Sequence, residues 1–187
     1  MAKADLRIPD MIVPRVLDID FEKLSSLKRW YYIFDLDNTL ELPTEIRPSW
    51  QITMKIHQAQ DVGWIKGLVI LSNVGVDKKW FVAGSSRVAR VRVAAEQLQG
   101  QYLACLWPKL KPNPALFIQA IEMMDASVEE TVVIGDQISK DIKGGNAVGA
   151  LTILVNPLGP DMWLTAVIRR LKERDIRARL GVPSGVS

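Results

Sequence analysis

The sequence has few of the features that mark secreted, disulfide-bonded or membrane-spanning proteins. Cys105 is the single cysteine, so an internal disulfide is excluded and a cysteine-based zinc site is not expected. The longest uninterrupted apolar run, Tyr102–Trp107, is much shorter than the about 20 residues of a spanning helix. The first ten residues include acids and a proline where a signal peptide needs an apolar segment. We therefore expect a cytoplasmic protein.

Excess charge of one sign is also scarce. The net charge is +3, which gives no reason to expect binding to nucleic acid. The excess lies in residues 161–180, which hold six basic and three acidic residues, whereas the remainder of the chain is balanced. Within this segment we predict an amphipathic helix over 162–180. Such a helix can contact an anionic membrane surface peripherally, or it can be a solvated helix that packs on its own domain. Its apolar face holds Trp163, Leu164, Val167, Ile168 and Leu171.

The composition that remains is that of an ordinary globular domain, with 48% hydrophobic and 24% charged residues. We expect one domain over residues 1–187, in which the proline-broken residues 1–29 wrap around the rest. Short apolar runs alternate with longer helical patterns, which is typical of a doubly wound α/β fold with a parallel sheet. The predicted strands are 30–34, 68–71, 102–107, 131–134 and 151–155, and the predicted helices are 48–61, 86–98, 113–124, 140–148 and 162–180.

Polar side chains follow four of the predicted strands at the point where each strand ends. In a parallel sheet these ends meet at one edge, so the side chains are expected to converge there. Three or four carboxylates at one place would repel one another unless a cation lies among them. The convergent residues are Asp35 and Asp37 after the first of these strands, Ser72 and Asn73 after the second, Lys111 after the third, and Asp136 and Asp141 after the fourth.

This set of side chains is suited to phosphoryl transfer. Carboxylates are typical ligands of Mg²⁺ when phosphate is also bound, and a lysine supplies a positive charge for phosphate. Asp35 and Asp37 are two residues apart and would share a face if the strand continued. One of them could then attack phosphorus while the other handles protons. Asp141 either binds the metal or orients Asp136 or Lys111. A receiver-type domain has a similar acidic pocket but does not need the second aspartate.

These motifs resemble those of the haloacid-dehalogenase (HAD) superfamily of phosphohydrolases. Residues 35–40, Asp-Leu-Asp-Asn-Thr-Leu, are similar to its first motif, and Ser72, Lys111 and the pair Asp136 and Asp141 to the other three. The resemblance implies a Rossmann-like fold and a Mg²⁺ cofactor. It also implies that Asp35 is a nucleophile forming a phosphoaspartate, and that Asp37 is the acid and base. Ser72 and Lys111 would hold the phosphoryl oxygens, and Asp35, Asp136 and the Asp37 carbonyl would bind the metal.

A narrower resemblance concerns the phosphatidylglycerophosphate phosphatases within this superfamily. It is carried by residues 135–146, by Asn156-Pro-Leu158 with the basic segment after it, and by residues 9–20. It implies that the protein removes the terminal phosphate of phosphatidylglycerophosphate, an anionic phospholipid, at a membrane surface to give phosphatidylglycerol, and this is the function that we expect from the sequence. The sequence departs from that family at three places. Val74 stands where an asparagine is common, Lys140 where a threonine is usual, and residues 41–44 replace apolar residues.

The segments between the motifs leave no room for a substantial cap domain, so we expect an open site. An open site admits a lipid head group, and it also admits a phosphoprotein or a small phosphorylated metabolite. Asn73, Lys78 and Lys79 are candidate substrate-binding residues. Together with Arg87, Arg90 and Arg92, the two lysines form a basic group that either faces an anionic head group or is a solvated helix face. A non-catalytic phosphate- or lipid-binding module is the alternative of a different class.

Overall fold

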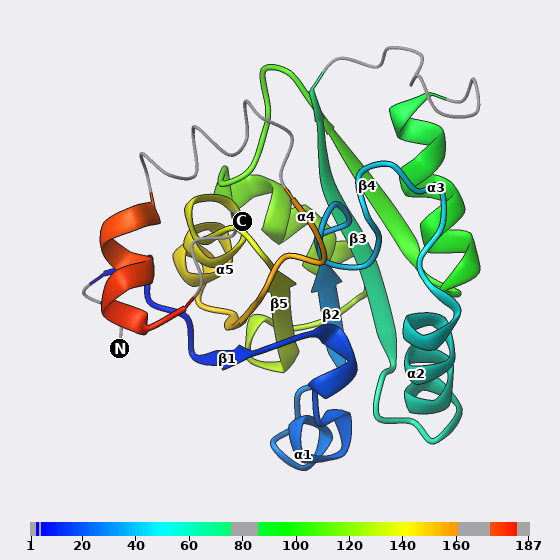
Figure 1. Cartoon of the computed structure of the whole chain (residues 1–187). Coiled ribbons are helices and arrows are strands. Elements are labelled where there is room, and N and C mark those ends of the chain that lie inside the picture. The colour runs from blue at the N-terminus through cyan, green and yellow to red at the C-terminus, as the bar shows by residue number, and fades with distance from the viewer. Residues whose placement is uncertain (1–2, 4, 76–85, 161–172, 183–187) are drawn as a thin grey trace.

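The computed structural model describes residues 3, 5–75, 86–160 and 173–182 of the chain. Its centre is a six-stranded sheet in which every pairing is parallel, with strand order β1-β6-β5-β2-β3-β4 (Figure 1). The doubly wound α/β fold predicted from the sequence is confirmed. The strands are β1 (Met11–Val13), β2 (Tyr31–Phe34), β3 (Gly67–Gly75), β4 (Gln101–Leu106), β5 (Thr131–Gly135) and β6 (Leu151–Val155).

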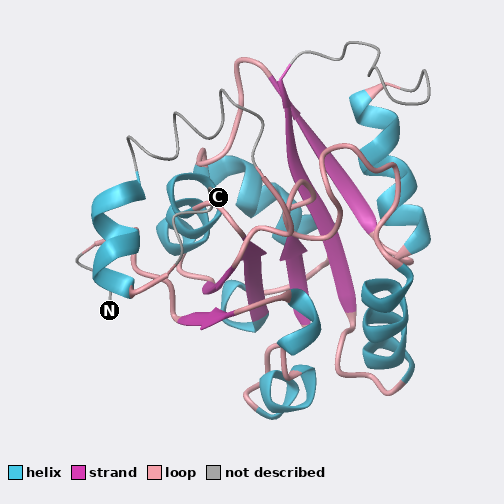
Figure 2. Ribbon diagram, viewed as in Figure 1, coloured by secondary structure: helices cyan, strands magenta, loops and turns pink. Residues whose placement is uncertain are grey.

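Helices cover both faces of this sheet (Figure 2). Tyr32 and Phe34 of β2 point into one core, whereas Ile33 between them points into the other. The first core is closed by helices α1, α2 and α3, and the second by α4. Continuous apolar runs are therefore buried on both sides, as in other parallel sheets. The helices are α1 (Phe21–Ser26), α2 (Trp50–Asp61), α3 (Arg87–Gln97), α4 (Pro114–Met123) and α5 (Lys143–Val148).

Local sequence accounts for where the helices begin. Ser49 and Ser86 each accept a hydrogen bond from a backbone N–H three residues later, which caps α2 and α3. Asn113 caps α4, whose first residue is a proline. The predicted helix 140–148 is divided, because a π-helical turn, η3 (Ile138–Ile142), precedes α5. A Cβ on Gly144 of α5 would clash with the Phe117 ring, so a glycine is required where α5 packs on α4.

Residues 1–29 contribute more than a covering segment. Met11–Val13 forms β1, which pairs with β6 at the edge of the sheet. This sixth strand was not predicted, because three residues between prolines carry too little pattern and Ile12 is exposed. A 3₁₀ turn, η1 (Val16–Asp18), and α1 follow, and they place Val16, Ile19 and Phe21 in the core.

The predicted C-terminal helix is only partly within the described residues. Its membrane-facing candidates, 163–171, lie outside them. Residues 173–180 are helical, and Ile176 is buried against Ile138, Ile142 and Leu154. This part of the chain therefore packs on η3 and β6.

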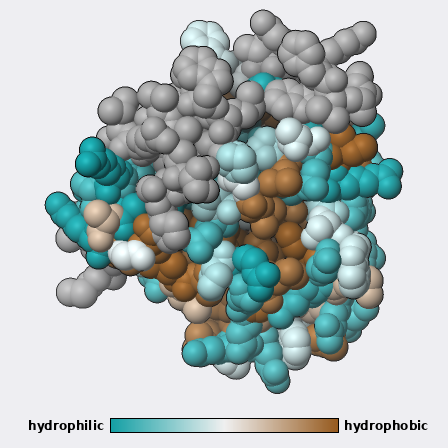
Figure 3. Space-filling model, in the orientation of Figure 1, coloured by the Kyte–Doolittle hydropathy of each residue, from teal (hydrophilic) through white to brown (hydrophobic). Residues whose placement is uncertain are grey.

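The surface in the orientation of Figure 1 shows hydrophobic residues near its middle, with hydrophilic residues mainly to the right of and below them (Figure 3). Among the described helices, none combines the length and the apolar character needed to cross a membrane.

Candidate active site

The carboxyl edge of the sheet brings together four of the predicted site residues. Asp35 directly follows β2, Asp136 directly follows β5, Asp141 lies in η3, and Lys111 lies between β4 and α4. The Lys111 ammonium donates to Asp35 Oδ1 at 2.7 Å, to Asp141 Oδ1 at 2.6 Å and to the Leu71 carbonyl at 2.8 Å. All four side chains are buried. Strands that are far apart in the sequence thus meet at one small polar centre.

The three carboxylates of this centre form a group suited to a metal ion. Asp35, Asp136 and Asp141 each offer an oxygen, and these oxygens lie within 4.8 Å of one another. Buried carboxylates so close together repel one another, and a single ammonium does not balance three of them. Oxygen donors of this kind fit Mg²⁺, which binds a few carboxylates and keeps positions for water and phosphate. The donor set therefore fits the cofactor expected from the sequence.

Burial and charge act against each other at this centre. Burial alone would lower the pKa of Lys111, but the charges of Asp141 and Asp35 outweigh it and raise the pKa. Burial raises the pKa of Asp141 to about 6, against the opposing effect of Lys111. The lysine is therefore held in its charged form between the two carboxylates.

The position of Asp141 depends on close packing at the end of β5. A Cβ on Gly135 would collide with the Asp141 carboxyl group, so only glycine allows the side chain to approach the strand. The Gln137 N–H donates to Asp141 Oδ2 at 3.2 Å and fixes the carboxylate from the other side. These contacts aim the second oxygen of Asp141 toward Lys111. Binding of the metal by Asp141 stays a prediction.

Ser72 and Asn73 both lie in β3 near its carboxyl end, and Ser72 is buried. The Asn73 side chain accepts a hydrogen bond from the Lys111 N–H at 2.8 Å, and its amide donates to the Lys111 carbonyl at 3.4 Å. Asn73 therefore holds the backbone of the loop between β4 and α4 that carries Lys111. Its proposed contact with substrate, like that of Ser72, stays a prediction. Lys78 and Lys79 lie outside the described residues.

Asp37 occupies a different position from the other acids. Strand β2 ends at Phe34, so Asp37 lies in a loop and not on a continued strand. The Leu36 carbonyl accepts from the N–H groups of the next residues in this loop, Thr39, Leu40 and Glu41. The Asp37 side chain is 40% exposed, and its Oδ1 accepts a hydrogen bond from Arg90 Nη2 at 2.9 Å. Solvent therefore reaches this acid, while a guanidinium from α3 holds one of its oxygens.

Arg90 does not fit either interpretation that the sequence left open for it. It is neither a solvated residue of α3 nor a free cation for a head group, because it is 4% exposed and ion-paired to Glu41 and Asp37. One feature of the sequence was unusual here, since Glu41 stands where the phosphatidylglycerophosphate phosphatases have an apolar residue. It did not identify Arg90 as the partner of Glu41.

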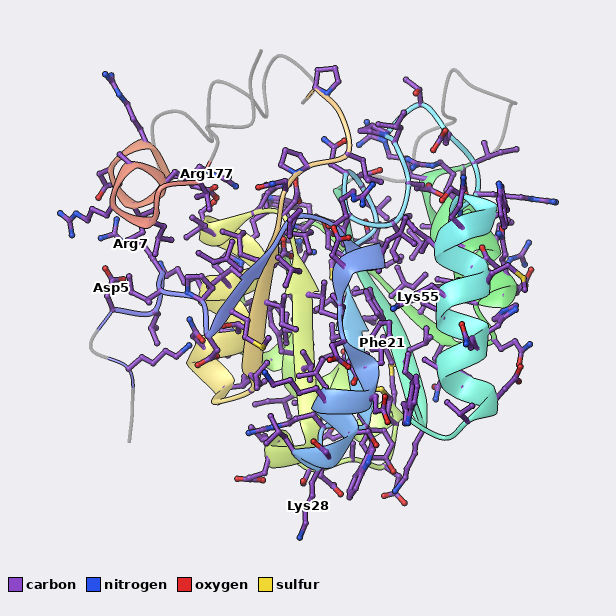
Figure 4. The ribbon with its side chains drawn as sticks, turned by 60° about the horizontal axis from the view of Figure 1, so that its bottom comes forward. Asp5, Arg7, Phe21, Lys28, Lys55 and Arg177 are labelled. Carbon is purple, nitrogen blue, oxygen red and sulfur yellow. The ribbon has the colours of Figure 1, made fainter. Side chains whose placement is uncertain are left out.

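A second buried arginine lies at the opposite flank of the site. Figure 4 shows Arg177 on the helix 173–180. It donates to the Asp136 carbonyl at 2.6 Å and pairs with Glu173 at 3.0 Å. Glu173 in turn accepts from the Ser139 N–H and Oγ at 2.7 and 2.8 Å. From the sequence, Arg177 is one of six basic residues in the segment 161–180, and no role is predicted for it. Its spacing of four from Glu173 was the available signal.

Comparisons with known proteins agree with this chemistry. A family model described as HAD-hydrolase-like matches residues 110–157, which include Lys111, Asp136 and Asp141. A curated protein of Bacillus subtilis (strain 168), named a probable phosphatase YqeG, is 30% identical over 177 residues, covering 91% of this chain and 90% of that protein.

Two shorter matches also concern phosphatases. A glyceraldehyde 3-phosphate phosphatase of Methanopyrus kandleri is 42% identical over 45 residues, which are 24% of this chain and 19% of that protein. A dihydroxyacetone phosphatase of Corynebacterium glutamicum (strain R) is 31% identical over 81 residues, which are 43% of this chain and 27% of that protein. The chain thus spans less than a third of either of these two relatives.

Proposed function

The chain belongs to the HAD-like phosphatase superfamily, and from that premise we propose that it hydrolyses phosphate monoesters with Mg²⁺ through a phosphoaspartate on Asp35. The observation that carries the proposal is the buried centre in which the Lys111 ammonium contacts both Asp35 and Asp141. Asp35, Asp136 and the Asp37 carbonyl would hold the metal, with Asp141 beside them. When bound, Mg²⁺ would neutralise the charge of the phosphoryl group and of the carboxylates around it.

In the proposed reaction an Asp35 oxygen attacks phosphorus and forms the phosphoaspartate. The bond from phosphorus to the ester oxygen breaks, and Asp37, acting as an acid, transfers its proton to that oxygen. Asp37, now a carboxylate, then takes a proton from water as the water oxygen attacks the same phosphorus. The bond from Asp35 to phosphorus breaks, so that inorganic phosphate leaves and both aspartates return to their starting states. Ser72 and Lys111 would hold the phosphoryl oxygens throughout.

Phosphate release from p-nitrophenyl phosphate, with Mg²⁺ and with a chelator, tests this reaction. We expect turnover that requires Mg²⁺ and a phosphoenzyme that is trapped on the wild-type chain but not on Asp35→Asn. Turnover that persists in Asp35→Asn would contradict the assigned nucleophile. If the folded wild-type protein released phosphate from none of a broad set of phosphate esters, the result would instead favour a non-catalytic binding module.

For the substrate, we infer a small phosphorylated metabolite. This inference is supported by the matches to phosphatases named for glyceraldehyde 3-phosphate and dihydroxyacetone. A small phosphate ester has few groups besides its phosphoryl group, so contacts to the phosphoryl oxygens could be enough to bind it. In the proposed reaction Ser72 and Lys111 would supply these contacts.

A second candidate is phosphatidylglycerophosphate, presented by an anionic membrane surface on which the protein would sit peripherally in the cytoplasm. The specific observation in its favour is that Asp37 is 40% exposed, so the acid of the site is reachable from outside. The motif of residues 135–146 favours the same substrate through its resemblance. No nucleic-acid partner is proposed, since the net charge is small.

A direct comparison of substrates separates the two candidates. Phosphate release would be measured from a panel of soluble phosphate esters and from phosphatidylglycerophosphate in mixed micelles, at equal Mg²⁺. A value of kcat/KM that is highest for a soluble ester supports the metabolite, whereas release from the lipid alone supports the membrane candidate. Sedimentation with vesicles of anionic lipid tests membrane association separately.

A further inference from the structure

Arg90 and Glu41 form a buried ion pair that reaches the proposed acid of the reaction. Arg90 lies in the first turn of α3, whereas Glu41 and Asp37 lie in the loop after β2. Arg90 Nε donates to Glu41 Oε1 at 3.1 Å, and Nη2 donates to both Glu41 Oε1 and Asp37 Oδ1. One guanidinium thus joins α3 to two carboxylates of the first-motif loop.

We propose that Arg90 and Glu41 are positioning residues that hold the Asp37 carboxyl group in the orientation needed to protonate the leaving oxygen. The proposal rests on the proposed function, because it assigns a role within that reaction. Neither residue is placed in contact with substrate. They act through Asp37.

The geometry of the contact supports this role. Asp37 is 40% exposed, so without a partner its side chain would rotate among several orientations. Arg90 engages Oδ1, and a proton for the leaving oxygen can then come from Oδ2. The planar guanidinium presents fixed N–H directions, and its other contacts to Glu41 prevent it from following Asp37 outward. General acids work within a narrow range of distance, so an anchored carboxyl group is favoured over a mobile one.

The loop itself is tied down at the same place. The Asn38 N–H donates to the Glu41 carbonyl at 2.8 Å, and Asn38 has a left-handed backbone conformation with φ of 63°. Asp37 and Glu41 also form a backbone bridge. The residue that carries the acid and the residue that anchors Arg90 are therefore linked through both backbone and side chains.

Stability alone is a poor reason for such a pair. Glu41 is fully buried, and a buried ion pair is often no more stable than apolar residues of similar volume. Burial raises the pKa of Glu41 to about 7, and the charge of Arg90 opposes that rise. An apolar side chain at position 41 would avoid this cost. The pair is thus better explained by what it does to Asp37.

Dependence on the leaving group tests the proposal. Phenyl phosphate and p-nitrophenyl phosphate are similar in shape, but nitrophenolate departs readily without a proton and phenolate needs one. Because kcat/KM reports steps up to departure of the leaving group, it isolates the acid role of Asp37. In Arg90→Gln we expect kcat/KM to fall about 10-fold or more on phenyl phosphate and less than about 3-fold on p-nitrophenyl phosphate. Asp37→Asn should show the same selectivity more strongly, and Arg90→Lys should restore part of it.

A second variant separates a loss of positioning from a loss of folding. Glu41→Leu with Arg90→Met removes both charges together and leaves no unpaired buried ion. We expect the same selective loss on phenyl phosphate, with circular dichroism and thermal unfolding confirming the fold. The matched control is Arg15→Gln, since Arg15 is 59% exposed and pairs with Asp18 at 3.1 Å in η1. It should leave both esters unchanged.

The outcomes separate this proposal from the proposed function. Equal losses on the two esters in folded variants would mean that Arg90 does not act through Asp37, and would overturn the positioning role alone. A wild-type protein that hydrolyses neither ester with Mg²⁺ would overturn the proposed function, and this role with it.

Discussion

The two flanks of the site are each held by a buried arginine paired with a glutamate, but the arginines contact different parts of the loops. Arg90, from α3, contacts the side chain of Asp37 in the loop after β2. Arg177, from the helix 173–180, contacts the backbone carbonyl of Asp136 in the loop after β5. The two helices lie on opposite sides of the sheet edge (Figure 1). The same chemical pair therefore holds a side chain at one flank, that of the proposed acid, and a backbone carbonyl at the other, that of a proposed metal ligand.

The partners of the two glutamates differ in a corresponding way. Glu41 accepts from Arg90, whereas Glu173 accepts from Arg177 and also from the Ser139 N–H and Oγ. The first pair holds one further carboxylate, that of Asp37. The second is part of the hydrogen bonding of η3, the turn that carries Asp141. Changes at the first flank should thus appear in proton transfer, and changes at the second in metal binding and stability.

The largest effect should come from Asp35, the proposed nucleophile. We expect Asp35→Asn to lower kcat by a factor of at least about 10³ on every ester, since this change removes the proposed nucleophile. Steady-state phosphate release measures this loss. Asp61→Asn, an identical change at an exposed position at the end of α2, should leave the rate unchanged. If Asp35→Asn kept its rate, the two flanks would have no common chemistry to compare.

Replacing each pair by apolar residues should separate the flanks in stability. We expect Glu41→Leu with Arg90→Met to change the free energy of unfolding by less than about 1 kcal/mol. Glu173→Leu with Arg177→Met should lower it by about 2–3 kcal/mol, because the Ser139 N–H and the Asp136 carbonyl lose their partners. Urea denaturation of both double variants measures the difference. Equal costs would mean that the two pairs are equivalent.

Metal affinity should distinguish the flanks next. We expect Arg177→Lys to weaken Mg²⁺ binding about 10-fold, since residues that orient metal-binding loops have effects of this size. Arg90→Lys should weaken it less, because Arg90 contacts the side chain of Asp37 and not its carbonyl. The matched control is Arg15→Lys at an exposed position, which should leave Mg²⁺ affinity unchanged. Calorimetric titration of each variant with Mg²⁺ gives the affinity without any substrate. A larger loss in the Arg90 variant would reverse the assignment of the two flanks.

An exposed pair provides the smallest effect and the baseline for the others. Arg15 and Asp18 are 59% and 34% exposed and lie 3.1 Å apart. A double-mutant cycle at this pair should give a coupling energy that is much smaller than at either buried pair and that decreases with added salt. Thermal unfolding at low and high salt measures it. A coupling as large as those at the buried pairs would show that burial is not what distinguishes them.

The convergence of the site was predictable because it follows from topology. Residues at the carboxyl ends of parallel strands must meet at one edge, so Asp35, Lys111, Asp136 and Asp141 could be brought together from their order alone. The roles of these residues and their substrate remain proposals. The sequence pattern predicted where these four residues lie, and not what each of them does.

The two buried arginines were not predictable in the same way. A charged residue on an amphipathic helix is usually solvated, and Arg90 and Arg177 are exceptions because each has a buried glutamate as partner. Glu41 lies 49 residues from Arg90, so no helical spacing reveals the pair. The predicted strand 30–34 and β2 both end at Phe34, so the end of this strand was predictable. The pairing of residues that are far apart in the sequence depends on tertiary structure.

The pairing of β1 with β6 has a consequence for how the molecule is assembled during translation. Met11–Val13 is made early, but its partner Ile153–Val155 appears some 140 residues later. Until then, the first strand has no neighbour to accept its hydrogen bonds. Arg177 emerges later still, after every other described residue of the site, and only then can it donate its hydrogen bond to the Asp136 carbonyl. A ribosome-bound chain that ends just after the fourth HAD-like motif would therefore still lack two contacts. These are the pairing of β1 with β6 and the hydrogen bond from Arg177 to the Asp136 carbonyl.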